Sequence, residues 1–299
     1  MLNFKKLMSA LNRMRKKNFP SRFVSQRKYN NLQSKYNTLV DSIVSFDNGL
    51  THQALMRSII SPSQNLAHQE ICFFVSYAPT PLIKPHVEKH IKALQESGIG
   101  VVLVINTDDI AGEFSIPATL TQLCGLYIRE NKGFDFGAWS QIYKILHEKI
   151  DVNYLYLIND SIVGPLSEVF FEEMLKKIHT SNADFIGLTS NENPYLHLQS
   201  FFLVLRKNIL TNEIFRSFFK SLWQLPTKEM VIDFYEVRIT CLLQLLGYKI
   251  ETLFPTDDLT MVKTDAVIHN LDALLERGFP YIKTSVLHTP IGQKILKKY

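Results

Sequence analysis

The chain has 299 residues, of which 46% are hydrophobic and 20% charged, and its formal net charge is +5. This length and composition predict a globular protein with one large or two modest domains and exclude a disordered chain. Cys72, Cys124 and Cys241 are far apart and form no CxxC pair, which argues against a zinc ribbon or a disulfide framework. Because no apolar run approaches the roughly 18 residues of a membrane-spanning helix, and no signal-peptide core is present, we expect a cytoplasmic protein.

The positive charge is concentrated near the N-terminus. The first 40 residues carry ten basic side chains and no acidic one, so the rest of the chain has a formal net charge of −5. Within residues 1–28, Phe4, Leu7, Leu11 and Met14 recur at helical spacing, which predicts an amphipathic helix that contacts an anionic membrane surface. A solvated basic arm is the alternative. We expect no nucleic-acid partner, since few aromatic side chains lie among these charges.

Residues 29–46 follow a second helical pattern. Apolar side chains recur three and four residues apart, and the pattern ends at Asp-Asn-Gly in residues 47–49. This predicts either a short coiled coil that joins two copies of the chain or a helix that packs on its own globular body. We therefore assign residues 1–62 to a basic, helical N-terminal extension and residues 63–299 to the globular domain.

The remaining pattern predicts alternating strands and helices. Residues 71–77, 85–97 and 100–105 read as strand, helix and strand, a unit whose two strands are parallel and whose crossover is right-handed. Further strands are predicted at residues 126–129, 154–159, 184–188, 200–205 and 248–254, and further helices at about 135–147, 166–178, 213–222 and 235–246. The sequence thus predicts an α/β fold with a mixed central sheet flanked by helices.

Residues 130–139 read Glu-Asn-Lys-Gly-Phe-Asp-Phe-Gly-Ala-Trp and connect a predicted strand to a predicted helix. Glycine lets the backbone adopt positive φ or approach a ligand closely, and the N-terminus of the helix directs unpaired N–H groups at negative charge. This loop is therefore predicted to hold a ligand that carries phosphate.

Polar residues also follow the other predicted strands. Ser76 follows the first strand, Asn106 the second, and the segments 131–135 and 159–161 the third and fourth. In open α/β sheets, ligands bind outside the carboxyl ends of the strands, where such loops converge. We expect these residues to surround one site.

Three residues could carry chemistry there, and each has a simpler explanation. Asp160 could hold Mg²⁺ or Mn²⁺ between two phosphates, or it could bond the backbone of its own turn. Glu236 could be a general base, or it could stabilise the first turn of the helix that it is predicted to open. His288 could supply a metal ligand or a phosphate donor, or it could be an ordinary surface or core histidine.

Two motifs carry a resemblance to a known family. They are residues 130–139 and residues 157–165, Leu-Ile-Asn-Asp-Ser-Ile-Val-Gly-Pro, with shorter matches at 198–202 and 280–283. Over about residues 71–289 the chain resembles the rhamnan synthesis protein F family, glycosyltransferases of bacterial cell-surface polysaccharides. The resemblance implies a GT-A-like (Rossmann-type) fold and an enzyme that moves a sugar, rhamnose or another deoxyhexose, from a nucleoside-diphosphate donor to a lipid-linked polysaccharide, with inversion. With the basic residues 1–28, such an enzyme is expected to be cytoplasmic and peripheral on the inner face of the bacterial plasma membrane.

The resemblance also assigns roles to residues. Glu236 would be the catalytic base, and Asp160 would be catalytic and would bind a divalent cation, Mn or Mg. From its own position in the sequence, His288 remains a candidate further ligand. Together with the strand-end residues, the expected donor-binding set is Ser76, Asn106, Asn131, Lys132, Gly133, Asp135, Asn159 and Ser161.

One departure from the family pattern puts the metal in question. Ile158 replaces the first acid of the usual D-x-D, so Lys132, Arg129 or Lys283 could neutralise the leaving diphosphate instead. A non-catalytic subunit that binds a sugar nucleotide or glycan within an assembly complex is the alternative function.

Overall fold

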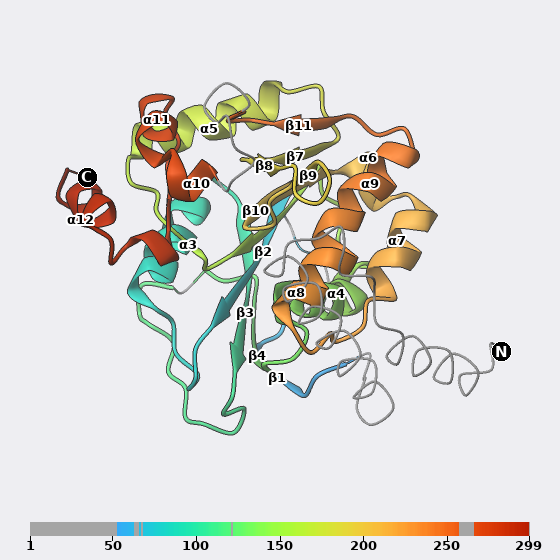
Figure 1. The fold of residues 1–299 in the computed structure, drawn as a ribbon. Coiled ribbons are helices and arrows are strands. Elements are labelled where there is room, and N and C mark those ends of the chain that lie inside the picture. Colours follow the sequence, from blue (N-terminus) through green and yellow to red (C-terminus); the bar gives the residue numbers. More distant parts are fainter. Residues whose placement is uncertain (1–52, 63–65, 67, 121, 257–265, 299) are drawn as a thin grey trace, which may run out of the picture. The chain divides into compact units, whose positions relative to one another are not determined.

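The computed structural model describes residues 53–62, 66, 68–120, 122–256 and 266–298 (Figure 1). The chain divides into two compact units, Met1–Leu50 and Thr51–Tyr299. The predicted membrane-binding helix and the predicted coiled-coil helix both lie outside the described residues. Among the described helices, none has the length and apolar character that crossing a bilayer requires.

A mixed sheet of eight strands forms the centre of the second unit, in the order β1-β4-β3-β2-β5-β10-β7-β11. The strands β4, β3, β2 and β5 run parallel to one another, whereas β10 is antiparallel to both of its neighbours and β1 is antiparallel to β4. The predicted α/β fold with a mixed central sheet is confirmed. The strands are β1 (Met56–Ile60), β2 (Glu70–Tyr77), β3 (Gly100–Thr107), β4 (Gly125–Glu130), β5 (Tyr154–Asn159), β7 (Phe185–Gly187), β10 (Phe202–Arg206) and β11 (Ile250–Thr252).

Helices cover both faces of this sheet (Figure 1). They are α3 (Pro85–Glu96), α4 (Phe134–Leu146), α5 (Glu168–Thr180), α6 (Lys207–Leu210), α7 (Glu213–Lys220), α8 (Lys228–Val231), α9 (Val237–Leu245), α10 (Ala266–His269), α11 (Leu271–Glu276) and α12 (Pro290–Lys298). Phe74 of β2 packs in the core formed with α3 and α5, and the adjacent Phe73 packs in the core formed with α4 and α7. Because both faces of β2 are buried, its sequence is a continuous apolar run.

Two boundaries differ from the sequence expectation. The strand β1 pairs with β4, Met56 opposite Arg129, so the globular body includes residues before 63. Its five residues are only partly buried or exposed and carry little of the apolar pattern that marks the inner strands. The helix expected to begin at Tyr235 begins instead at Lys228, where the Thr227 side chain accepts a hydrogen bond from the backbone N–H of Met230.

That helix contains a π-helical turn, η2 (Ile232–Glu236), which joins α8 to α9. Glu236 therefore lies inside a continuous helical segment and not in its first turn. The interpretation of Glu236 as a residue that stabilises a helix N-terminus is wrong, because the nearest helix start is two turns earlier. Turns of this kind occur mostly as single widened turns and are frequent at functional sites.

Candidate active site

The two sequence motifs meet at the carboxyl ends of the central strands. Asn159, the last residue of β5, pairs in register with Val75 of β2. Its side-chain amide donates a hydrogen bond of 2.7 Å to Oδ2 of Asp135, at the start of α4. The other carboxylate oxygen of Asp135 accepts from the backbone N–H of Phe136 at 2.9 Å. The loop after β4 and the turn after β5 are thus joined by a direct side-chain contact.

A cavity of about 260 Å³ opens beside this contact. Its walls come from the motif loops, from α8 and η2, and from the two short strand pairs β8–β9 (Ser190–Asn191, His197–Leu198) and β6–β12 (Ile162–Val163, Ile282–Lys283). Two acids and two lysines face it together with polar groups of the β5 turn, and the lining includes Asp135, Asn159, Ser161, Lys228, Glu236 and Lys283.

Glu236 is held in this wall by two side chains. Its Oε1 lies 3.4 Å from Nε2 of His197, and its Oε2 accepts a hydrogen bond from the hydroxyl of Ser200. The imidazole is almost completely buried, and its Nδ1 donates to the carbonyl oxygen of Tyr195 at 2.7 Å. Burial lowers the pKa of His197, but the hydrogen bonds to Glu236 and to Tyr195 outweigh it, so the pKa is raised. Both ring nitrogens therefore face acceptors, which favours the imidazolium.

Asp135 binds a proton more tightly than an ordinary aspartate does. Burial raises the pKa of Asp135 to about 6, and the negative charge of Glu236 acts in the same direction. The backbone N–H of Phe136, the amide of Asn159 and the charge of Lys228 oppose this rise only in part. The cavity thus presents two carboxylates with different hydrogen-bond partners, Asn159 and Phe136 for Asp135 and Ser200 and His197 for Glu236.

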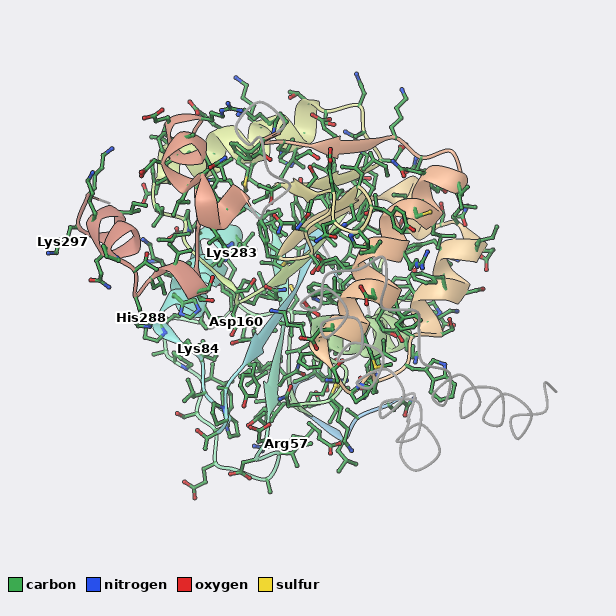
Figure 2. The ribbon with its side chains drawn as sticks, in the orientation of Figure 1. Arg57, Lys84, Asp160, Lys283, His288 and Lys297 are labelled. Atoms are coloured by element: carbon green, nitrogen blue, oxygen red, sulfur yellow. The ribbon has the colours of Figure 1, made fainter. Side chains whose placement is uncertain are left out.

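Asp160 has a separate environment and is not part of the cavity wall. Its Oδ2 accepts from Nζ of Lys84 at 2.7 Å, and both side chains are labelled in Figure 2. The same oxygen accepts from the hydroxyl of Ser76 at 2.8 Å and from the backbone N–H of Tyr77 at 3.0 Å. The ammonium group already compensates the charge of the carboxylate. In the described part of the chain, no three His, Cys, Asp or Glu side chains gather as a metal site. These residues do not fit a divalent cation at Asp160 in this arrangement.

Arg129 is completely buried and cannot reach a ligand in the cavity. The expectation that it could neutralise the leaving diphosphate is therefore wrong. Its guanidinium donates to the Gln141 side chain at 2.9 Å, to Oδ1 of Asn106 at 2.9 Å, and to the Gln224 side chain. Neutral oxygens thus hold this charge, and burial lowers the pKa of Arg129 to about 10. Asn106 is also buried, and it contributes to this network instead of lining the cavity.

The glycine of the motif loop also packs against the protein itself. Gly133 has φ +68°, and a Cβ added there would lie 2.8 Å from Cα of Gln224. The close approach that its sequence suggested is therefore to the Gln224 segment. We find no open space at Gly133 for a ligand.

The other expected residues are distributed around the site. The amide of Asn131 donates to Asp108 at 3.2 Å, and Nζ of Lys132 lies 2.7 Å from Glu130. His288 is exposed. It takes part in none of the ion pairs of the described residues, so the structure does not bring it to Asp160 as a ligand.

The cavity residues that the sequence reasoning missed include three with polar side chains near Glu236 and Asp135: His197, Ser200 and Lys228. Ser200 belongs to a segment that matched the family, so its polar side chain just before an apolar strand was a usable signal. His197 and Lys228 carry no local signal, because their approach to the site depends on the path of the β8–β9 hairpin and on the start of α8.

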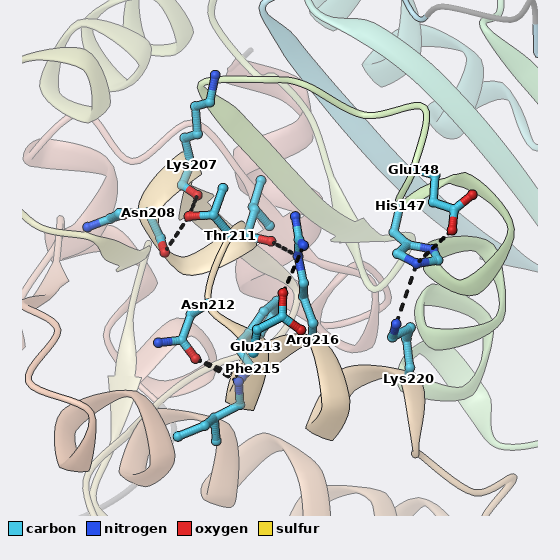
Figure 3. A network of polar contacts seen from close by, with 12 residues as sticks. His147, Glu148, Lys207, Asn208, Thr211, Asn212, Glu213, Phe215, Arg216 and Lys220 are labelled. Atoms are coloured by element: carbon cyan, nitrogen blue, oxygen red, sulfur yellow. Dashed lines mark hydrogen bonds and ion pairs between the residues drawn. The ribbon is translucent and has the colours of Figure 1, made fainter.

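A second polar cluster joins the end of α4 to α6 and α7 (Figure 3). Lys207 pairs with Asp151 at 2.6 Å, Arg216 pairs with Glu213 at 3.2 Å, and Lys220 contacts His147 at 3.4 Å. The cavity beside them measures only about 60 Å³. Since these charged groups are already partnered, the cluster connects helices and has no free group for a ligand.

A family model described as rhamnan synthesis protein F matches residues 113–298, which include both motifs and Glu236. The chain belongs to the rhamnan synthesis protein F family. A relative from Sinorhizobium fredii (strain NBRC 101917 / NGR234), named uncharacterized protein y4gN, is 24% identical over 213 residues. That match covers 69% of this chain and 54% of the relative, so the chain spans about half the length of this curated family relative.

Three solved structures have partial similarity to this member of the rhamnan synthesis protein F family. The mannosyltransferase PcManGT from Pyrobaculum calidifontis, in complex with GDP-Man and Mn2+, has a TM-score of 0.39 at 10% identity, over 66% of this chain and 57% of that one. A glycosyltransferase involved in glycosylation of the major capsid of PBCV-1 has a TM-score of 0.37 at 10% identity, over 77% and 98%. A CMP-2-keto-3-deoxy-manno-octonic acid synthetase complexed with CTP has a TM-score of 0.34 at 14% identity, over 71% and 99%. TM-scores below 0.5 do not establish a common fold, and the family assignment depends on the sequence match.

Proposed function

We propose that this chain is a glycosyltransferase of surface-polysaccharide synthesis that uses a nucleoside-diphosphate sugar as its donor. One observation carries the proposal: the loop of the first motif, the turn of the second motif and Glu236 contribute to a single cavity, although they are far apart in the sequence. Carboxylate and amide groups suit the hydroxyls of a sugar, and the amines of Lys228 and Lys283 suit the charge of a departing phosphate.

In this proposal Glu236 is the general base. An acceptor hydroxyl donates its proton to Glu236, and the oxygen attacks the anomeric carbon as the bond to the diphosphate breaks. His197 and Ser200 hold the carboxylate in one orientation, since they bond its two oxygens separately. Attack from the side opposite the leaving group inverts the anomeric centre. Positive groups near the leaving oxygen stabilise the negative charge that develops there.

The family match favours rhamnose or another deoxyhexose as the transferred sugar and a lipid-linked glycan as the acceptor. The cavity volume of about 260 Å³ lies just below the roughly 300–1,000 Å³ of pockets for drug-sized ligands, so it suits a sugar ring with the nucleotide outside it. A GT-A-like arrangement, contact of residues 1–28 with the inner face of the plasma membrane, and dimer formation through residues 29–46 belong to the same proposal.

A non-catalytic, sugar-nucleotide-binding scaffold subunit is the second candidate. Ile158, completely buried in β5, replaces the first acid of D-x-D, and Asp160 is already paired with Lys84. Such a protein would bind a donor without turning it over.

The two candidates are separated by incubating the purified chain with nucleoside-diphosphate sugars that differ in base and sugar, and measuring the nucleoside diphosphate released with and without a lipid-linked acceptor. The enzyme proposal expects release that Glu236→Gln abolishes and that Glu229→Gln, an exposed acid on α8, leaves unchanged. Saturable donor binding by calorimetry without any release from the wild-type chain would support the scaffold instead.

A further inference from the structure

One carboxylate oxygen at the carboxyl end of the sheet carries three donors. Oδ2 of Asp160 accepts from Lys84 at 2.7 Å, from Ser76 at 2.8 Å and from the backbone of Tyr77 at 3.0 Å. The Lys84 side chain is 32% exposed and that of Asp160 is 16% exposed, so solvent reaches the lysine side chain more than the aspartate. The pair thus holds a partly exposed ammonium group at the carboxyl end of the sheet.

The position of Lys84 is set by the backbone. Lys84 is the residue that precedes α3, with extended φ −69° and ψ 146°, and the rigid Pro85 begins the helix after it. The partner Asp160 lies between Asn159 and Ser161, which both line the cavity. A short segment whose conformation is restricted therefore holds the ammonium next to the cavity turn.

A divalent cation would compete with this ammonium. A carboxylate oxygen has about two lone pairs, and Oδ2 of Asp160 already accepts from three donors. A metal ion bound to this carboxylate would lie within a few ångströms of Nζ of Lys84, where charges of the same sign repel strongly at the low effective dielectric of a partly buried site. At Oδ2, the lysine occupies the place that a cation would need.

A second lysine flanks the same turn. Lys283 lines the cavity and pairs in register with Ile162, and the next residue, Thr284, donates from its backbone to the carbonyl oxygen of Ser161 at 2.8 Å. Lys84 is attached to the turn through Asp160 and Lys283 through the β6–β12 pair. The labelled side chains of Lys84 and Asp160 can be followed together in Figure 2. Two lysines are thus attached to the turn that follows β5, and their two positive charges match the two negative charges of the diphosphate in a nucleoside-diphosphate sugar.

We propose that Lys84, held by Asp160, takes the place of the divalent cation and binds the diphosphate of the donor, so that this site works without a metal. The inference deepens the proposed function and depends on it. Asp160 acts through Lys84 as a positioning residue, and Lys84 contacts the phosphate oxygens directly.

The test measures binding of GDP, UDP and dTDP to the purified chain by calorimetry, once in EDTA and once with excess Mn²⁺. For the nucleotide that binds wild type most tightly, we expect the affinity in EDTA and the affinity with excess Mn²⁺ to agree within about threefold. Lys84→Met should weaken binding in EDTA by about 10- to 100-fold, the value of one charge-assisted hydrogen bond. Lys84→Arg keeps the charge and should retain most of the affinity. Lys92→Met, which removes an exposed lysine of α3 paired with Glu96, is the matched control and should bind as wild type does.

The outcomes that would overturn the inference are distinct from failure of the proposed function. A wild-type affinity that falls more than tenfold in EDTA, or Lys84→Met binding as tightly as wild type, overturns the role of Lys84 while leaving a nucleotide-binding enzyme. The wild-type comparison does not depend on whether any variant folds. If none of the three nucleotides binds wild type in either condition, the donor proposal itself fails, and the role of Lys84 fails with it.

Discussion

The imidazole Nε2 of His197 lies 3.4 Å from Oε1 of Glu236 and links the β8–β9 hairpin to the π-helical turn η2. The second ring nitrogen of His197 donates to the carbonyl oxygen of Tyr195. With acceptors on both sides, the ring has no free nitrogen to take a proton from a substrate. Of this pair, Glu236 is therefore the group suited to act as base, and His197 orients it.

Removing His197 should change the rate through its effect on Glu236. We expect Glu236→Gln to lower turnover by about 10²- to 10⁴-fold, the usual contribution of a general base. His197→Gln should lower it by only about tenfold. It should also remove from the pH–rate profile the titration of His197, whose pKa is raised by its bonds to Glu236 and Tyr195. The measurement is initial rate of donor turnover against pH.

His179 is the control for that experiment, because it forms a similar histidine–glutamate pair outside the cavity. Nε2 of His179 lies 2.9 Å from Glu70 at the surface, outside the cavity. His179→Gln should leave both the rate and the profile unchanged. A His197→Gln profile that keeps the wild-type shape would argue against any orienting role for His197.

The raised pKa of Asp135 predicts a pH dependence of stability. Its folded-state pKa of about 6 is above the ordinary value of 3.8, so the folded chain binds this proton more tightly than the unfolded chain does. The stability contributed by this proton is fully present below pH 3.8 and is lost as the pH rises through 6. The expected loss is about 1–3 kcal/mol.

This dependence can be isolated by comparing urea unfolding at about pH 4.5 and about pH 7 for wild type, for Asp135→Asn and for Asp233→Asn. Asp233 is an exposed acid in the π-helical turn η2, whereas Asp135 lies in α4. Asp135→Asn should lose less stability than wild type between the two pH values, while Asp233→Asn should follow wild type. Equal losses in all three proteins would contradict the pKa assigned to Asp135.

The inner strands could be predicted from the sequence because both of their faces are buried. Neighbouring residues such as Phe73 and Phe74 enter opposite cores, so β2 appears as an unbroken apolar run between polar residues. Parallel strands end at one edge of the sheet, and there the predicted loops after β4 and β5 meet through Asn159 and Asp135. Asn106, at the end of β3, instead binds the buried Arg129. The order and register in which the strands pair, however, cannot be read from the residues of any one strand.

The details of the site depend on contacts that the sequence does not encode locally. Lys84 reaches Asp160 across 76 positions, and Ser200 reaches Glu236 across 36. The widened turn η2 also interrupts the helical spacing before Glu236, so the pattern predicted a helix start seven residues too late. Contacts between residues far apart in the sequence, and the direction in which each helical side chain points, arise only in the packed fold. They decide which acid faces the cavity.

Arg129 should contribute strongly to stability through hydrogen bonds alone. Arg129→Met removes the donors to Asn106, Gln141 and Gln224, and these buried oxygens lose a charge-assisted hydrogen bond each. We expect the free energy of unfolding to fall by about 2–4 kcal/mol. Arg238→Met, at an exposed position of α9, should change it by less than about 0.5 kcal/mol. Similar values for both variants in urea unfolding would show that the network contributes little.

Gly133 and Gly98 separate backbone strain from crowding. Both have positive φ, +68° and +82°, but a Cβ at Gly98 would meet nothing within 4 Å, whereas at Gly133 it would lie 2.8 Å from Cα of Gln224. Gly98→Ala should therefore cost only the strain of the left-handed conformation, about 1–2 kcal/mol. Gly133→Ala adds a collision with backbone that cannot rotate away, and we expect a total of about 3–5 kcal/mol.

The same collision should also reach the cavity. Displacing the Gln224 segment from Gly133 moves the start of α4, and Asp135 lies in the first turn of that helix. We therefore expect Gly133→Ala to weaken donor binding even at a temperature where the variant remains folded, and Gly98→Ala to leave binding unchanged. Calorimetry on both variants, next to their urea unfolding curves, makes the comparison. If Gly133→Ala and Gly98→Ala lower the free energy of unfolding equally, the packing of Gln224 on the motif loop is not what requires glycine at position 133.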